Sequence, residues 1–248
     1  MPKKELSNLD QLKRNLVLAA LPPEDLERIE PNLESVTLSQ GEIIFESGES
    51  PTYLYFPTTA VISLIYLAED GKTAEVGFAG NIGLVGFDIF MGGDSQAAQT
   101  VVQRSGEAIR MKAKNVLDEF HHCGTFQDVL LRYTRAMMAQ MSQLAVCNSL
   151  HTLQQQLCRW ILLNYDQVPG NEIEVTHELI ANLLGVRRES VTQSAGILQE
   201  MGVIENTRGV IKILNRKELE KIVCECYRVV ADECERLQSE SGGNSDKK

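Results

Sequence analysis

The sequence lacks a long apolar segment. Of its 248 residues, 43% are hydrophobic and 23% are charged, and no apolar run approaches the ~18 residues that a membrane-spanning helix needs. The residues after Met1 do not have the layout of a secretory signal peptide. Six cysteines without an export signal predict a cytoplasmic protein with free thiols. The length suits two globular domains.

Motifs of the common catalytic folds are also missing. The sequence holds no P-loop, no dinucleotide-binding fingerprint and no nucleophile elbow. Its four histidines are scattered, and its carboxylates form no recognisable acid–base pair. We therefore expect neither enzymatic activity nor a cofactor.

Positive charge is in the minority. The chain has 24 Lys and Arg against 34 Asp and Glu, a net charge of −10. This balance argues against indiscriminate nucleic-acid binding but permits binding through a local docking face. Residues 151–220 hold seven Lys or Arg and nine Asp or Glu, so DNA binding should be confined to chosen sites at modest salt.

The most informative pattern lies in residues 176–201, where two short amphipathic helices flank a turn at Gly185. Thr176 suits the N-cap of the first helix, and Gly permits the sharp turn. The inward-facing positions are Leu179, Ile180, Leu183, Val191, Ile197 and Leu198. This order predicts a helix-turn-helix. The alternative is an ordinary helical hairpin with a solvated charged face.

A hairpin follows directly. Ile204 to Leu214 predicts two short strands around the turn Asn206-Thr207-Arg208-Gly209, which would be the wing of a winged helix. The candidate DNA-contacting residues are Thr176, Arg187, Arg188, Glu189, Ser190, Thr192, Gln193, Arg208 and Lys212.

The N-terminal half has a different sequence pattern. Between about Leu33 and Met111, short alternating runs are broken by glycine and proline, which predicts an antiparallel sandwich, barrel or roll. A long helix then begins near Thr125. Its heptad-like positions are Leu130, Thr134, Met137, Met141, Leu144 and Asn148. They predict a coiled-coil seam and a homodimer, unless the stripe packs against its own domain.

We therefore predict an α+β protein: an N-terminal antiparallel β-roll, a long dimerisation helix and a C-terminal winged helix-turn-helix. The expected segments are a sensor domain over residues 1–124, a dimerisation helix over 125–148, a DNA-binding domain over 149–238 and a disordered tail over 239–248. Within the DNA-binding domain, a continuous last helix is expected from Arg216 to about Leu237.

In this order, the elements resemble the Crp/Fnr superfamily of bacterial transcription regulators. The resemblance rests on Gly41-Glu42-Ile43-Ile44-Phe45 with Gly48, on Val76 to Gly86, and on Leu184 to Val191. It implies that Arg188 and Glu189 read base edges in the major groove. It also implies RNA polymerase as a second partner, with the 167–172 loop as a candidate contact.

The sensor domain departs from the family's cyclic-nucleotide binders. Those proteins use a Gly-Glu cassette for the ribose and an Arg followed by Ser or Thr and Ala for the phosphate. The matching stretch, residues 80–103, contains no Lys or Arg, and no glycine in it precedes Glu. A buried phosphate without a cation is very costly, so we expect no cyclic AMP binding.

Two cysteine-containing segments leave other sensor chemistries open. His121-His122-Cys123 could ligate a metal or be a polar linker. Cys224, Cys226 and Cys234 could form a thiol switch or zinc site, although Cys226 and Cys234 lie on an apolar stripe where cysteine acts as a small hydrophobe. Cys147 and Cys158 fit core positions, and the expectation is no metal site.

The predicted function is a homodimeric, sequence-specific transcription regulator that reads a palindromic operator. The alternative is a ligand-gated sensor that responds to a cyclic nucleotide, to thiol redox state or to a metal. A protein-interaction adaptor with a vestigial DNA-binding domain would also fit the net charge.

Overall fold

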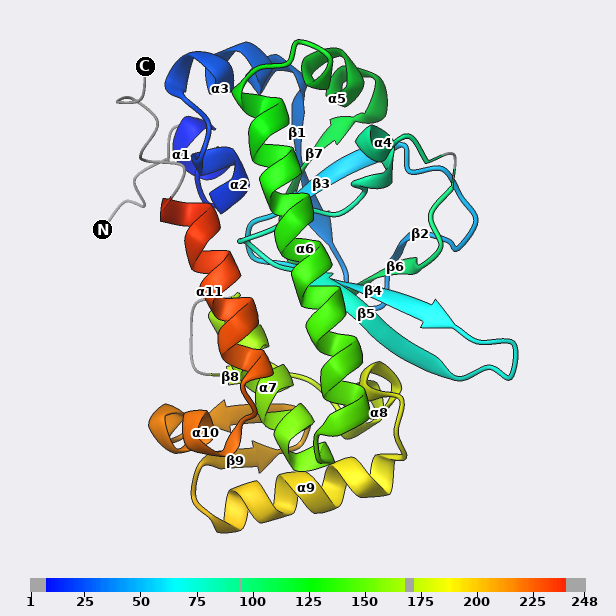
Figure 1. The fold of residues 1–248 in the computed structure, drawn as a ribbon, viewed down its shortest axis with the longest axis vertical. Helices are drawn as coiled ribbons and strands as arrows, with labels where there is room; N and C mark the ends of the chain where they lie inside the picture. Colours follow the sequence, from blue (N-terminus) through cyan, green and yellow to red (C-terminus); the bar gives the residue numbers. More distant parts are fainter. Residues whose placement is uncertain (1–7, 94, 168–171, 240–248) are drawn as a thin grey trace.

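The computed structural model describes residues 8–93, 95–167 and 172–239 (Figure 1). Three short helices, α1 (Asn8–Leu12), α2 (Leu16–Ala19) and α3 (Pro23–Ile29), lead through a 3-10 turn, η1 (Glu30–Asn32), into the N-terminal strands. These strands are β1 (Leu33–Leu38), β2 (Ile43–Phe45), β3 (Tyr53–Pro57), β4 (Val61–Leu67), β5 (Thr73–Ala79), β6 (Gln99–Arg104) and β7 (Gly106–Lys112). They form two antiparallel sheets, ordered β1-β7-β3 and β2-β6-β4-β5. The predicted β-roll is confirmed. A short helix within it, α4 (Asp88–Met91), was not expected.

After the roll, α5 (Ala113–Phe120) leads to the long helix α6 (Thr125–Leu150). The roll lies on one side of α6 and α11 (Cys226–Ser239) lies along another side (Figure 1). Leu130, Tyr133 and Met137 of α6 join the roll's core, which also contains Leu84 and Val85. Among the described residues, no helix combines the length and apolarity needed to cross a membrane.

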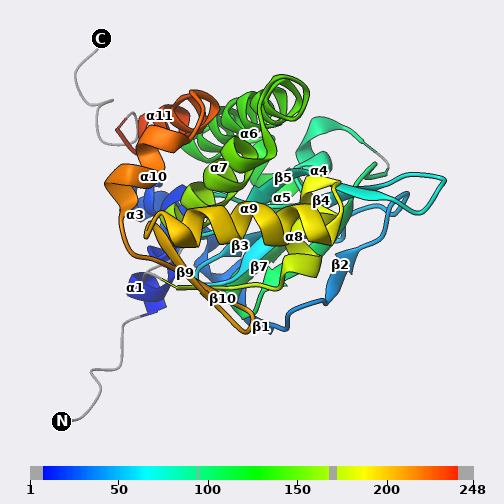
Figure 2. The same cartoon turned by 90° about the horizontal axis from the view of Figure 1, so that it is seen from below.

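The C-terminal part has its own core. Its elements are α7 (Leu153–Asp166), β8 (Glu172–Glu174), α8 (His177–Leu184), α9 (Arg188–Glu200), β9 (Ile204–Thr207), β10 (Val210–Ile213) and α10 (Arg216–Ile222), followed by α11. The strands form one antiparallel sheet in the order β8-β10-β9. Trp160 and Ile161 of α7, Leu198 of α9 and Ile211 of β10 are buried together. α9 forms the lower edge of the molecule in Figure 1 and is seen along its full length from below (Figure 2).

The heptad-like stripe of α6 does not form an outward-facing seam. Leu130, Thr134, Met137 and Leu144 are buried within the protomer, Met141 is half-buried, and only Asn148 is exposed. The roll and α11 cover the stripe, so the own-domain packing that the sequence left open is correct for these residues. The helix also continues to Leu150, two residues beyond its predicted end.

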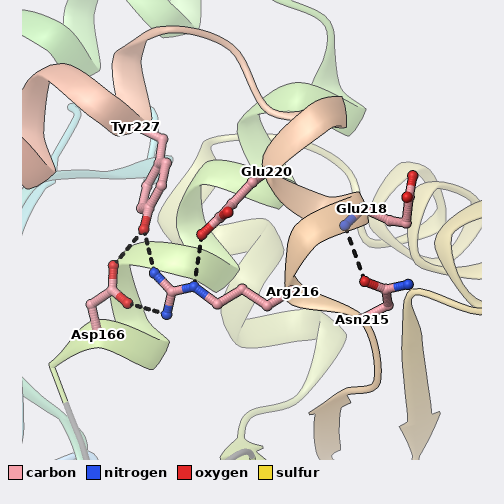
Figure 3. Close-up of polar contacts among 6 residues, drawn as sticks. All are labelled: Asp166, Asn215, Arg216, Glu218, Glu220 and Tyr227. Atoms are coloured by element: carbon pink, nitrogen blue, oxygen red, sulfur yellow. Dashed lines mark hydrogen bonds and ion pairs between the residues drawn. The ribbon is translucent and has the colours of Figure 1, made fainter.

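The predicted continuous last helix is wrong. It breaks between α10 and α11, where Val223 adopts an extended conformation (ψ 151°). Arg216 holds the two pieces beside α7 (Figure 3). Its guanidinium donates to Asp166 at 2.7 Å and to the Tyr227 hydroxyl at 2.7 Å, and its Nε donates to Glu220 at 2.7 Å. The sequence pattern could not show this arrangement, because the apolar spacing runs across the break.

A buried chain of polar side chains connects the roll to α7. The Ser63 hydroxyl lies 2.7 Å from Glu75 Oε1 and 2.8 Å from Gln103 Oε1. Gln103 Nε2 donates to Asn164 Oδ1 at 2.7 Å, and Asn164 Nδ2 donates to Trp160 O at 2.9 Å. A hydroxyl has one proton, so Glu75 Oε1 and Gln103 Oε1 are alternative acceptors for the Ser63 hydroxyl.

Burial favours the neutral, protonated form of the Glu75 carboxyl. The side chain is fully enclosed, and desolvation raises its pKa from 4.5 to about 7, against the opposing hydrogen bond from Ser63 and the charge of Arg159. Because the folded-state pKa is the higher one, the folded protein keeps a proton that the unfolded chain loses between pH 4.5 and 7. Stability therefore falls as pH rises through this window.

We expect Glu75→Gln to remove this pH dependence, because an amide keeps a donor toward Ser63 and cannot ionise. The free energy of unfolding should rise by about 3 kcal/mol at pH 8 and change little at pH 4.5. Urea denaturation across this pH range measures both values. Glu69→Gln, on the exposed β4–β5 turn, makes the same charge change and is the control. The assignment would be contradicted if the free energy of unfolding of the wild type rose by about 3 kcal/mol between pH 5 and 7 instead of falling.

Candidate nucleic-acid interface

The helix-turn-helix is built as the sequence predicts. The Thr176 side chain accepts a hydrogen bond from Leu179 N at 3.2 Å and caps α8. Gly185 ends this helix in the left-handed conformation with φ 67°. A side chain there would be strained whatever space surrounds it. Arg187 follows in an extended conformation as the N-cap of α9, and its side chain makes no capping bond.

α9 has one buried and one exposed face. Its buried residues are Val191, Ser194, Ala195 and Leu198, which pack toward α7 and α8. Ile197 was predicted to be buried but is 40% exposed, because the inward stripe passes through Ser194 and Ala195 instead. The face that remains free belongs to polar and charged residues.

The structure places the candidate DNA-contacting residues on the surface to different degrees. Six side chains from α9 and the wing are exposed: Arg187, Arg188, Glu189, Thr192, Gln193 and Arg208. Thr176 is exposed as well, while Ser190 and Lys212 are half-buried. Arg188 Nε lies 3.9 Å from Glu178 Oε2, and Lys212 Nζ lies 3.8 Å from Glu172 Oε1. These long, exposed ion pairs leave both cations available to an anionic partner.

Two residues that sequence reasoning missed hold the interface together. Asn206 Nδ2 lies 2.8 Å from His177 Nε2, and His177 Nδ1 lies 2.9 Å from Thr192 Oγ1. Because the amide donates, Nε2 accepts and the ring proton is on Nδ1, facing Thr192. The Thr192 hydroxyl in turn donates to Arg188 O at 3.1 Å. Thr192 is thus engaged inside the protein and is a weaker candidate for DNA contact than its exposure suggests.

This network connects α8, α9 and the wing. His177 begins α8, Thr192 lies on α9, and Asn206 lies in β9. The sequence placed Asn206 in the turn, but the two-residue turn is Arg208-Gly209, with Gly209 at φ 83°. No local pattern signals the network, since its three side chains come from separate elements.

The β-roll touches the helix-turn-helix directly. The Thr73 hydroxyl, at the start of β5, donates to Asn182 O of α8 at 3.0 Å. Ile65 of β4 packs against the C-terminal core. Beyond the other end of β5, Gly80 N donates to Oε1 of Gln167, the C-cap of α7, at 3.1 Å. Gln167 is buried and is therefore not the surface contact that the sequence suggested; residues 168–171 of that loop lie outside the described residues.

Two protein-family comparisons match this architecture. Residues 35–122 match the cyclic nucleotide-binding domain, and residues 155–222 match the Crp-like helix-turn-helix domain. The chain belongs to the Crp/Fnr superfamily. It is a transcription regulator of this family with a helix-turn-helix DNA-binding domain. No curated protein sequence matches it.

Several solved structures share the fold of this Crp/Fnr regulator. FixK2 from Bradyrhizobium japonicum matches with a TM-score of 0.66 and 16% identity, over 77% of this chain and 98% of FixK2. A putative Crp/Fnr regulator from Eubacterium rectale matches with a TM-score of 0.60 and 20% identity, over 85% and 98%. The c-di-GMP-responsive regulator CLP from Xanthomonas campestris gives 0.63 and 15%, over 77% and 99%.

We expect His177→Ala to loosen the winged helix. It removes two hydrogen bonds and leaves the half-buried Asn206 amide without its acceptor, so the free energy of unfolding should fall by about 1–2 kcal/mol. Urea denaturation measures the change. The adjacent, exposed Glu178→Ala is the matched control and should change stability little. Equal losses in both variants would mean that the network does not brace the domain.

Proposed function

We propose that this Crp/Fnr regulator binds a palindromic operator as a homodimer, with the start of α9 in the major groove of each half-site. The observation that carries the proposal is the joint exposure of Arg188, Glu189 and Gln193 on a helix held from behind by Val191 and Leu198. Arg suits guanine O6 and N7, Glu accepts from cytosine N4, and Gln suits adenine N6 and N7.

Phosphate contacts would come from the flanks of this surface. Arg187 is exposed at the N-cap of α9, and Arg208 is exposed at the tip of the wing. Either guanidinium can bind a phosphate oxygen and fix the register of the helix on the duplex. The surrounding carboxylates, Glu172, Glu178 and Glu189 among them, weaken non-specific attraction, which suits a protein that relies on base recognition.

A second face of α6 supports dimerisation. Beside the predicted stripe, Leu131, Met138 and Val146 are 49%, 61% and 40% exposed. Their spacing of seven and eight residues puts them on one side of the helix. Large apolar side chains gathered on one exposed helix face favour a protein–protein contact. We assign the dimer contact to this face.

The roll is proposed to work without cyclic AMP. Where the family's binders carry a phosphate-binding arginine, residues 80–103 provide no cation. Gln96 is buried there and donates its amide protons to Ala98 O and Thr100 Oγ1. Asp88 lies in the same stretch, and burial raises its pKa. The Gln96 amide already donates its protons within the protein, and the Asp88 carboxyl is partly buried, so both are poor partners for a phosphate anion.

The proposed location of the protein is the cytoplasm. The family resemblance suggests RNA polymerase as its second partner besides DNA. In the proposed mechanism, a change in the roll reaches the reading helix through the Thr73–Asn182 contact and through the Glu75–Ser63–Gln103–Asn164 chain. Such contacts can bias a two-state equilibrium of the DNA-binding domain.

We expect Arg188→Ala to relax selectivity at one base pair per half-site, at a cost of about 1–3 kcal/mol there. A random-sequence DNA selection with wild-type protein, with and without cyclic AMP, first defines the operator. Fluorescence anisotropy on single-base operator variants then measures the loss. Arg208→Ala is the comparison and should weaken all sequences alike.

Three outcomes of this experiment would count against the proposal. A uniform loss in Arg188→Ala would make this residue a phosphate anchor. If enrichment of an operator sequence required cyclic AMP, the proposal that the roll works without this ligand would be contradicted. No enrichment of an inverted repeat would favour the protein-interaction adaptor.

We expect the double variant Leu131→Glu, Met138→Glu to dissociate the dimer. Four carboxylates would meet in an apolar contact, so the dimer dissociation constant should rise at least about tenfold. Analytical ultracentrifugation measures this constant. Met91→Glu, at a 55% exposed methionine of the roll, is the control. A monomeric wild type would contradict the proposed homodimer, and a double variant as dimeric as wild type would place the contact elsewhere.

A further inference from the structure

Four side chains with metal-binding atoms meet where α6 ends. They are Cys147, His151, Cys224 and Cys226, and their ligand atoms all lie within 4.8 Å of one another. Among the described residues, no other group of three or more His, Cys, Asp or Glu meets this criterion. His121, His122 and Cys123 form no such group, and Cys234 lies outside the cluster.

Local structure explains how the four come together. Cys147 lies in the last turn of α6 and His151 is its C-cap, so the two share one side of the helix. Cys224 lies in the break between α10 and α11, and Cys226 is the first residue of α11. A continuous last helix would have placed Cys224 and Cys226 on different faces; the extended Val223 allows both to reach Cys147.

Two of the six distances between ligand atoms are close to the edges of a tetrahedral metal site. Cys147 Sγ and Cys224 Sγ are 3.5 Å apart, and Cys226 Sγ and His151 Nδ1 are 3.6 Å apart. Zinc bonds of about 2.3 Å to sulfur and about 2.0 Å to nitrogen set tetrahedral edges of roughly 3.8 Å between sulfurs and 3.5 Å between sulfur and nitrogen. Three sulfurs and one imidazole are a standard donor set for structural zinc.

His151 is oriented as a metal ligand would be. Its Nδ1 faces the thiols, while its Nε2 lies 3.4 Å from a carboxylate oxygen of Glu225. In metal sites, a carboxylate on the far nitrogen of the imidazole fixes the ring and increases its basicity. Glu225 lies between Cys224 and Cys226, so one segment of the chain supplies two thiols to one side of the ring and a carboxylate to the other.

A buried cation is present to balance the charge. Zinc bound by three thiolates and a neutral imidazole has a net charge of −1. Arg159 of α7 is 2% exposed, its Nε and Nη1 have no hydrogen-bond partner among the described residues, and its charge acts on Cys147. Burying a guanidinium is costly, and an anionic centre near Cys147 would add to the effect of Glu75 in offsetting that cost.

We propose that Cys147, His151, Cys224 and Cys226 bind one zinc ion per chain, with Glu225 positioning His151. Binding releases three thiol protons to solvent and involves no change of oxidation state. The ion would fasten the end of α6 to the α10–α11 junction. The winged helix leaves α6 and joins α11 at this place, so zinc would fix both of its connections to the rest of the protomer. The inference does not depend on the proposed operator.

Metal analysis of reduced protein, produced in zinc-supplemented cells and purified without a metal-affinity tag, tests the proposal. We expect one zinc per chain. After zinc removal by a chelator, Co²⁺ should produce the visible absorption of tetrahedral coordination and a thiolate charge-transfer band. Chelation should also lower the melting temperature by about 5 °C or more.

Variants locate the site. Cys226→Ser should lose the zinc and the Co²⁺ spectrum, whereas Cys234→Ser and Cys123→Ser, outside the cluster, should keep both. Glu225→Gln changes an exposed side chain that should not affect folding, and it should weaken zinc affinity about 10–100-fold. Circular dichroism confirms that each variant is folded.

Three results would overturn the proposal. One is reduced, folded wild-type protein that takes up neither Zn²⁺ nor Co²⁺. Another is uptake that survives Cys226→Ser. The third is metal-free protein in which Cys147 and Cys224 are joined by a disulfide when isolated from cells, which would make the pair a redox element.

Discussion

The burial of one stripe of α6 against the β-roll determines how the rest of the molecule is arranged. Leu130, Tyr133 and Met137 complete the roll's core, and the Tyr133 hydroxyl also donates to Leu84 O at 2.9 Å. Because this stripe is used inside the protomer, any contact with a second subunit has to use another side of the helix. α11 covers part of what remains and leaves the side of Leu131 and Met138 exposed.

The sequence predicted the fold well where the signal was local. Short alternating runs between Leu33 and Met111 located the region of the roll's strands, and Thr176 with Gly185 located the start and end of α8. The periodicity of α6 was detected, but its partner was not: spacing shows which residues share a face, not what covers that face. For the same reason the break at Val223 was missed, since the apolar stripe continues through it.

In the candidate DNA interface, too, local features were predictable and contacts between separate elements were not. Exposure of Arg187, Arg188, Glu189 and Gln193 followed from the amphipathic pattern of one helix. The engagement of Thr192 by His177 and Asn206 depends on three elements meeting in space, and residue type alone gave no sign of it. The four-residue cluster at the end of α6 is similar, since each cysteine separately fits a small apolar position.

The contacts between the roll and the C-terminal part are both apolar and polar: Val61 and Phe78 of the roll are buried with Leu163 and Val230, and a few hydrogen bonds lie beside this cluster. Thr73 meets α8 through one hydrogen bond, and Gln103 meets α7 through another. Each is directional and is lost by a small displacement, unlike an apolar contact that tolerates sliding.

The carboxyl of Glu75 has a further consequence. Burial raises its pKa to about 7, so the charge of this carboxyl changes close to neutral pH. Preparations handled below and above neutrality would therefore differ in charge at the place where the roll meets α7, beside Ser63 and Gln103.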